Sequence, residues 1–384
     1  HDVQIPPGAI VVPTSPIFGS TALVVDGLLD NKQAVNFLVD TGAGFNNLPY
    51  SLAKSLNAGT VLPVGQICGL DGLRTLIGSI KLKSLKLGSF NVNDPVFALQ
   101  PDKSSKTSAG LFSANSLGIL GNPVWSKTRL TIDYRNERLI IEIPPDRQAL
   151  DNYLSQVDEI DKAYLRNKNI DEAARNYEKL MLDAQKNKVK AVEALCIARL
   201  ASLYGERFAL LKESKWLDLA SKEYERAGKL AAESRNKTIE GQILSQWAML
   251  YLNAPRNNTD LISAQNLLKK ALTRSPSDAS IYAALGSAML KTEKTSDVPA
   301  RQMGISLIDR ALLLDPSNWQ ALWAKYKLLE SEKKTKDMAL LVAQMTRYYP
   351  DYPQVKELLS KRQKEAAKEP AKGNAPVTKH GKNK

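Results

Sequence analysis

The amino-acid pattern changes near residue 145, and this change most constrains how the chain can fold. Before it, short runs of β-branched and aromatic residues alternate with Gly, Pro, Asn and Asp, whereas after it the sequence is rich in Ala, Leu, Lys and Glu with helical periodicity. The 384 residues are enough for two or three domains. We predict an all-β domain over residues 1–147, an all-α domain over residues 148–367 and a basic, disordered tail over residues 368–384.

The first part is predicted to form a small barrel or sandwich of short antiparallel strands. Residues 22–29 and 34–39 read as strands joined by a turn at 30–32, and a further strand is expected over 80–87. A closing hairpin is expected from 129–134 and 138–143, and two prolines follow it, neither of which can donate to a strand ladder.

Regular spacing of proline in the second part indicates repeated helix pairs. Pro316 and Pro350 lie 34 residues apart, and Pro276 lies 40 residues before Pro316, so an insertion is expected near residues 291–298. The 34-residue spacing resembles tetratricopeptide repeats, and small residues such as Ala264 and Ala271 occupy positions where helices pack closely. We predict about five helix pairs between residues 150 and 350 and a capping helix over 353–368. An ordinary helical bundle is the alternative.

Two scarce residue types exclude much familiar enzyme chemistry. Histidine occurs only at His1 and His380, so a Ser-His-Asp or Cys-His nucleophile pair cannot form inside a folded domain. The two cysteines, Cys68 and Cys196, lie far apart, which excludes a Cys/His zinc site and a disulfide scaffold. No phosphate-binding glycine fingerprint is present. We therefore expect no metal and no cofactor.

The charge distribution bears on partners and location. Of the net charge of +13, the last 24 residues carry eight basic and two acidic side chains without any aromatic residue, so we expect no nucleic-acid partner. No apolar run approaches the ~18 residues of a membrane span. The chain starts with His, and residues 1–31 contain neither Lys nor Arg. We expect an exported protein, periplasmic or secreted, from which a signal peptide has been removed, rather than a cytoplasmic one.

Two short motifs carry the chemical signal. An apolar strand, Phe37-Leu38-Val39, runs directly into Asp40-Thr41-Gly42-Ala43, and about 80 residues later an apolar pair is bracketed by glycines, Gly118-Ile119-Leu120-Gly121. This ordered set resembles the retropepsin-like aspartic peptidases over residues 18–143.

The resemblance implies an aspartic endopeptidase that needs two copies of the chain, because only one Asp-Thr-Gly is present. Asp40 would be the catalytic residue, paired with Asp40 of a second copy across a two-fold axis. Two carboxyl groups in contact share a proton, so one can activate water while the other supports the carbonyl oxygen of the peptide. The residues implied to support the active-site loop are Thr41, Gly42, Ala43, Ile119, Leu120 and Gly121. The residues implied to belong to a flap over the substrate are Gly65, Gly69, Asp71 and Gly72.

Two other interpretations remain open. The β domain could be a catalytically inactive dimerisation unit of an adaptor whose helical repeats bind a protein partner, with Trp319 or Trp323 as an anchor. Ser51 and Lys54 also match the Ser-x-x-Lys spacing of serine acyl-enzymes, although the motifs that accompany it there are missing. Both peptidase and adaptor interpretations place Asp40 near a dimer axis.

Overall fold

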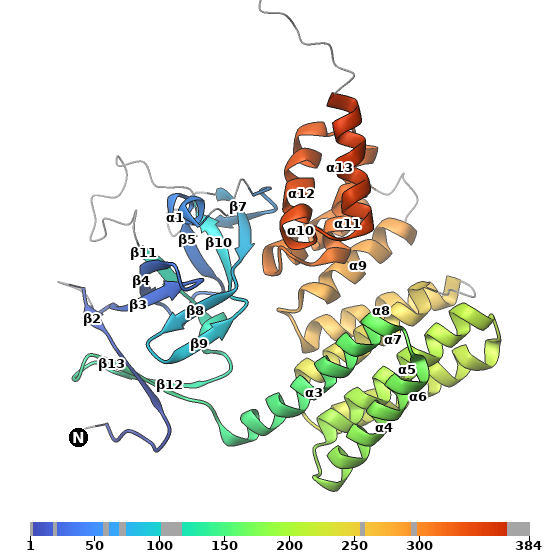
Figure 1. Cartoon of the computed structure of the whole chain (residues 1–384), viewed down its shortest axis with the longest axis horizontal. Coiled ribbons are helices and arrows are strands. Elements are labelled where there is room, and N and C mark those ends of the chain that lie inside the picture. Colours follow the sequence, from blue (N-terminus) through green and yellow to red (C-terminus); the bar gives the residue numbers. More distant parts are fainter. Residues whose placement is uncertain are drawn as a thin grey trace, which may run out of the picture.

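A β-rich domain packs against a curved array of helices in the computed structural model of the chain (Figure 1). The structure describes residues 3–17, 21–56, 61–68, 74–100, 117–253, 258–292 and 298–366. Within these residues, no helix is both long and apolar enough to cross a bilayer. The architecture confirms the predicted all-β part followed by an all-α part.

The β domain contains two sheets and two short helices. The strands are β1 (Ile10–Pro13), β2 (Ser15–Pro16), β3 (Leu23–Leu29), β4 (Gln33–Val39), β5 (Asn46–Pro49), β6 (Gly65–Cys68), β7 (Arg74–Lys81), β8 (Ser84–Leu87), β9 (Phe90–Asn93), β10 (Val96–Gln100), β11 (Leu117–Leu120), β12 (Arg129–Asp133) and β13 (Arg138–Glu142). The helices are α1 (Tyr50–Ser55) and α2 (Asn122–Trp125).

The larger sheet has the strand order β6-β7-β10-β5-β11-β4-β3-β8-β9, with β2 paired to β3. Most neighbours are antiparallel, but β11 runs parallel to β4, and β10 runs parallel to β5. The predicted hairpin of β3 and β4 is confirmed. Its turn residues Asp30 and Asn31 have φ of 50° and 55°, a left-handed conformation that Asp and Asn tolerate better than most residues.

The single strand predicted over residues 80–87 is wrong. Strand β7 ends at Lys81 and β8 begins at Ser84. The Asp30 carboxylate explains the break, because Oδ1 accepts hydrogen bonds from the backbone N–H of Lys83 (2.7 Å) and of Ser84 (3.0 Å). The chain therefore turns at this point, and β8 pairs with β3 instead of extending β7.

The smaller sheet has the order β1-β13-β12. The closing hairpin of β12 and β13 is confirmed. Strand β13 lies between β1 and β12, so it is not an edge of this sheet. Strands β1 and β12 are the two edges of this sheet, and β1 begins at Ile10.

The second part contains eleven helices within the described residues. They are α3 (Pro145–Asn167), α4 (Ile170–Lys186), α5 (Lys190–Leu211), α6 (Ser214–Glu233), α7 (Lys237–Asn253), α8 (Asn258–Arg274), α9 (Ala279–Thr292), α10 (Val298–Leu314), α11 (Trp319–Ser331), α12 (Thr335–Tyr348) and α13 (Pro353–Ala366).

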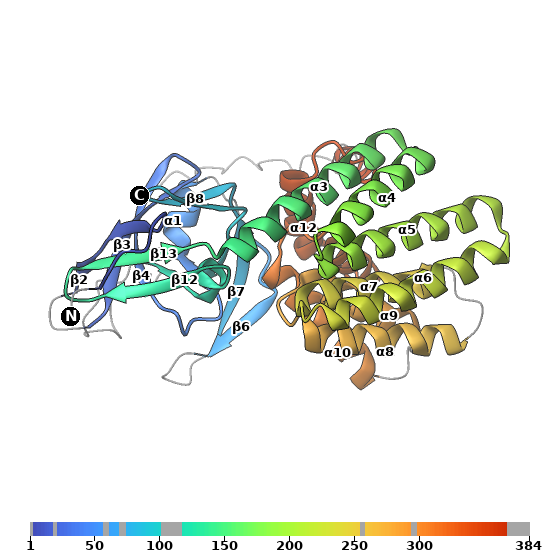
Figure 2. The same cartoon turned by 90° about the horizontal axis from the view of Figure 1, so that it is seen from below.

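These helices form antiparallel pairs that stack into a solenoid, as predicted. Successive first helices α5, α7, α9 and α11 contact one another along the stack, and Figure 2 shows α3 leading from the β domain into it. Ala264 and Ala271 are fully buried, as expected for positions of close helix packing. At Gly286 a Cβ atom would lie 2.8 Å from the carbonyl oxygen of Gly304, so glycine permits the close approach of α9 and α10.

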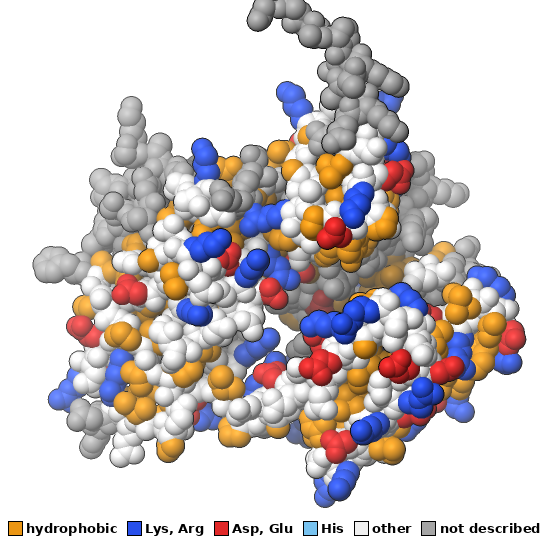
Figure 3. Space-filling view, viewed as in Figure 1, with side chains coloured by type: hydrophobic (Ala, Val, Ile, Leu, Met, Phe, Trp, Pro, Cys, Tyr) orange, Lys and Arg blue, Asp and Glu red, His pale blue; other side chains and the backbone are white. Residues whose placement is uncertain are grey.

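The two parts share one apolar core. Besides the core of the β sheet and two cores within the helices, a further cluster joins Leu62, Val64, Ile77 and Ala98 of the β domain to buried residues of α10, α11, α12 and α13. Figures 1 and 2 both place β7 beside these C-terminal helices. Below this contact, the space-filling view shows a hollow between the β domain and the first helices of the array (Figure 3).

Candidate active site

The Asp40 turn follows β4 directly and is fixed by backbone hydrogen bonds. The Asp40 N–H donates to the carbonyl oxygen of Leu120 (3.0 Å), and the Ala43 N–H donates to the carbonyl oxygen of Asp40 (3.1 Å). The Asp40 carboxylate accepts a 3.0 Å hydrogen bond from the Gly42 N–H through Oδ1. Asp40 and Thr41 are both exposed, so the turn presents a carboxylate and a hydroxyl at the surface of the single chain.

The Gly118–Gly121 segment lies beside this turn. Strand β11 runs parallel to β4 with Leu120 opposite Val39, which brings the two sequence motifs together. Leu120 is fully buried, whereas Ile119 is half-buried. At Gly121 a Cβ atom would lie only 2.4 Å from the carbonyl oxygen of Phe45 and 2.6 Å from that of Ala43. Only glycine therefore lets the turn pack this closely on β11.

Asn46 is a supporting residue that our sequence analysis missed. It is 2% exposed, and its Oδ1 accepts a 2.9 Å hydrogen bond from the Gly121 N–H. Its Nδ2 donates to the carbonyl oxygen of Val96 at 3.1 Å. One side chain thus ties β5 to β10 and to the residue after β11. Strand β5 reads Asn46-Asn47-Leu48-Pro49, and its two adjacent amides do not show in the sequence which of them is buried and needs partners.

The predicted flap residues are only partly described. Gly65 opens β6, which pairs with β7 in an antiparallel hairpin with Gly65 opposite Ile77. Gly69, Asp71 and Gly72 lie outside the described residues. The hairpin occupies the end of the larger sheet, next to β10.

Asp133 has a structural role. It is 3% exposed and forms a 2.8 Å ion pair with Arg138 across the β12–β13 hairpin. Hydrogen bonds from the Asn136 side chain, from Arg138 and from the Asn136 backbone lower the pKa of Asp133, although burial opposes them. The alternative nucleophile Ser51 and its partner Lys54 lie exposed on the short helix α1.

The described residues contain no cluster of three or more His, Cys, Asp or Glu side chains that could hold a metal ion. The exposed groups of the Asp40 turn are a carboxylate and a hydroxyl.

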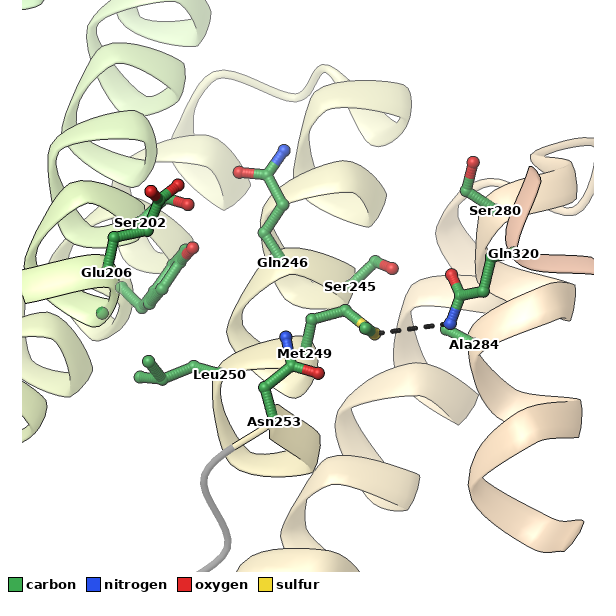
Figure 4. A pocket seen from close by; sticks show the side chains of 12 residues that line it. Ser202, Glu206, Ser245, Gln246, Met249, Leu250, Asn253, Ser280, Ala284 and Gln320 are labelled. Atoms are coloured by element: carbon green, nitrogen blue, oxygen red, sulfur yellow. Dashed lines mark hydrogen bonds between the residues drawn. The ribbon is translucent and has the colours of Figure 1, made fainter. Parts of the chain in front are cut away.

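A separate groove lies between helices of the array (Figure 4). Its cavity of about 350 Å³ is lined by residues of α5, α6, α7, α9 and α11, which include apolar side chains such as Met249 and Leu250, neutral polar side chains and one carboxylate, Glu206. The amide oxygen of Gln246 is buried without a hydrogen-bond partner. Across the groove, Gln320 Nε2 lies 3.8 Å from Met249 Sδ, the contact drawn in Figure 4.

The two tryptophans predicted as anchors do not line this groove. Trp319 and Trp323 are half-buried and stack on each other with ring centres 5.7 Å apart. Trp319 also packs edge-on against Tyr349 and Tyr352. Trp323 stacks on Tyr326 of the same helix, so each tryptophan packs against neighbouring aromatic side chains.

The fold and the Asp40 turn together define an aspartic-peptidase-like β domain joined to a helical repeat array. Residues 25–124 match the family model described as aspartyl protease. The N-terminal part is therefore an aspartyl-protease-family domain, as the Asp40 motif implied. No curated protein sequence gives a significant match.

Solved structures similar to each part were also found. A retropepsin-like aspartic protease from Rickettsia conorii is 17% identical, covers 37% of this chain and 95% of its own, and has a TM-score of 0.24. PilF from Pseudomonas aeruginosa is 16% identical over 55% of this chain and 98% of its own, with a TM-score of 0.30. MamA from Desulfovibrio magneticus RS-1 is 17% identical over 55% of this chain and 97% of its own, with a TM-score of 0.31.

Proposed function

We propose that the protein is an aspartic endopeptidase that acts as a homodimer through a pair of Asp40 carboxyl groups. The observation that carries this proposal is the Asp40 turn itself. It presents an exposed carboxylate at the end of a buried strand, and it is held by Leu120 and by close packing on Gly121. A rigid backbone around an exposed carboxylate is what precise pairing with a second copy requires.

The pair would supply both an acid and a base. Two carboxyl groups about 3 Å apart cannot both ionise, so the working pair carries one proton. The ionised member takes a proton from water, and the water oxygen attacks the carbonyl carbon of the peptide bond. The protonated member supports the carbonyl oxygen. The carboxyl that took the proton from water then gives it to the leaving nitrogen as the C–N bond breaks, which returns the pair to its singly protonated form. Thr41 would hydrogen-bond across the axis beneath the pair, Gly42 would let the backbone turn closely, and Ala43 would line the pocket.

Apolar groups near the termini of the β domain support dimerisation. Strand β1 is an exposed edge, and Val11 on it is 40% exposed. Ile5, Tyr134 and Ile143 are also exposed large apolar side chains of this domain. Unpaired strand edges and exposed apolar groups favour association with a second copy.

Cleavage of a broad peptide library from pH 3 to 8 tests the activity. We expect wild-type turnover to fall at both ends of this range, because the singly protonated pair is the active form. Asp40→Asn should reduce turnover by at least ~100-fold without loss of fold. Asp26→Asn is the matched control, since Asp26 is an exposed carboxylate on the neighbouring strand β3.

A second function, binding of an extended peptide by the helical groove, is favoured by one observation. The buried, unpartnered amide oxygen of Gln246 costs free energy unless a ligand donates a hydrogen bond to it. Backbone N–H groups of an extended peptide are suitable donors. Anisotropy of fluorescent library peptides should show binding that Gln246→Leu weakens in the full chain. Peptide binding without any turnover would support the adaptor interpretation.

A further inference from the structure

Helix α10 contacts both the Asp40 side of the domain and the β6–β7 hairpin. Arg310 lies over the ring of Phe45, two residues beyond Ala43, with 4.9 Å between the guanidinium carbon and the ring centre. One turn later, the Leu313 side chain lies 3.0 Å from where a Cβ atom of Gly65 would be. A single helix of the array therefore bridges two parts of the β domain.

Alternate side chains of strand β7 face the core of the β domain and the helices. Ile80 points into the core of the β domain, whereas Ile77 belongs to the core shared with the helices. Ser79, on the same face as Ile77, is 1% exposed and donates a 2.8 Å hydrogen bond from Oγ to the carbonyl oxygen of Leu312. That carbonyl lies in the last turn of α10, where no N–H of the helix can reach it.

A second helix fixes the base of the hairpin. The backbone N–H of Lys81 donates to the Tyr348 hydroxyl at the end of α12 (3.1 Å), and burial raises the pKa of Tyr348. The Lys81 ammonium donates to Ser317 Oγ (3.3 Å) and lies 3.8 Å from Asp315 Oδ1. The hairpin base is thus held by hydrogen bonds as well as by the shared apolar core.

We propose that α10 sets the separation between the β6–β7 hairpin and the Asp40 turn, and so sets the space in which a peptide would lie against the Asp40 pair. Leu313 and Arg310 act as positioning residues, because they touch Gly65 on one side and Phe45 on the other. This inference rests on the proposed peptidase function. It makes the helical array part of the substrate site, in addition to any binding in its own groove.

The test compares steady-state kinetics of full-chain variants on one peptide substrate. Leu313→Ala removes the side chain that contacts Gly65, and we expect KM to rise about tenfold while kcat stays within about twofold, because substrate binding is impaired and the carboxyl pair is not. Leu313→Met keeps the reach and most of the volume and should restore KM. Met303→Ala is the matched control, since Met303 lies on α10 and is 57% exposed.

Hydrogen exchange over residues 74–81 shows whether the hairpin has loosened. Faster exchange together with the raised KM supports the inference, whereas faster exchange with wild-type KM overturns it. If Leu313→Ala does not fold, Ser79→Ala takes its place, because it removes only the hydrogen bond to Leu312. The same two results then support or overturn the inference. Absence of turnover by the wild type overturns the proposed function and this inference together. Turnover by the wild type with the same KM in the variants overturns this inference alone.

Discussion

Ser79 on strand β7 donates a 2.8 Å hydrogen bond to the carbonyl oxygen of Leu312 on helix α10, 233 positions further along the chain. Both residues are buried, in a contact region shared by the β domain and the helical array. The β domain therefore depends on the array for the burial of apolar side chains at the β7–β10 end of its larger sheet. Experiments on its activity require the full chain.

A chain that ends at residue 147 is expected to expose Leu62, Val64, Ile77 and Ala98, which the helices cover in the whole protein. Exposed contiguous apolar surface promotes aggregation. We expect this fragment to bind the dye ANS and to self-associate beyond a dimer in sedimentation. A fragment that remains free of dye and no larger than a dimer would contradict the shared core.

Gly121→Ala is expected to destabilise the Asp40 turn. The added Cβ would lie 2.4 Å from the carbonyl oxygen of Phe45, and backbone atoms cannot move away as a side chain can. Overpacking of this kind costs about 1–3 kcal/mol. Gly44→Ala is the matched control, because no atom lies within 4 Å of a Cβ at Gly44. Chemical denaturation of both variants measures the difference, and equal stabilities would argue against the packing described.

Asp133 is expected to make the β domain sensitive to acid. Its pKa in the folded chain is lowered from 3.8, so the ionised carboxyl contributes stability above about pH 4. That contribution is lost as the pH falls through the folded pKa. The difference in thermal midpoint between wild type and Asp133→Asn should therefore be large at pH 6 and shrink below pH 4. A difference independent of pH would contradict the assignment.

Cys196 is expected to resist alkylation in the folded chain. The side chain is fully buried within the helical array, and burial raises the pKa of its thiol to about 12. At pH 8 only about one thiol in ten thousand would be ionised, and the thiolate is the reactive form. Mass spectrometry after iodoacetamide treatment should find Cys196 unmodified in native protein and modified in urea. Rapid native labelling would show that the array opens readily.

The parts of the fold predicted from the sequence depend on local patterns. The turn at Asp30 and Asn31 and the closely packed alanines of the array follow from residue type and spacing, and they are confirmed. The close packing of Gly121 against the Asp40 turn agrees with the pairing of the two sequence motifs, Asp40–Ala43 and Gly118–Gly121. Catalysis by Asp40 stays a prediction.

Other features depend on contacts between distant segments. Nothing in the sequence around Ser79 indicates a partner on α10. The sequence around Ile77 likewise resembles that of any strand whose two faces are both buried, so it does not indicate packing against helices. The break after Lys81 arises because Asp30, some 50 positions earlier, takes the N–H groups that would have continued the strand. Asn46 was missed because its two partners lie on segments 50 and 75 positions away.

The central claim is that two chains together build one catalytic pair. Mixing wild-type and Asp40→Asn chains tests this claim most directly. After the subunits of an equal mixture have exchanged, about a quarter of the dimers contain two wild-type chains. Because each active site needs both carboxyl groups, turnover per total chain should fall to about a quarter of the wild-type value. Turnover of about one half would mean that each chain works alone, and it would contradict the Asp40 pair.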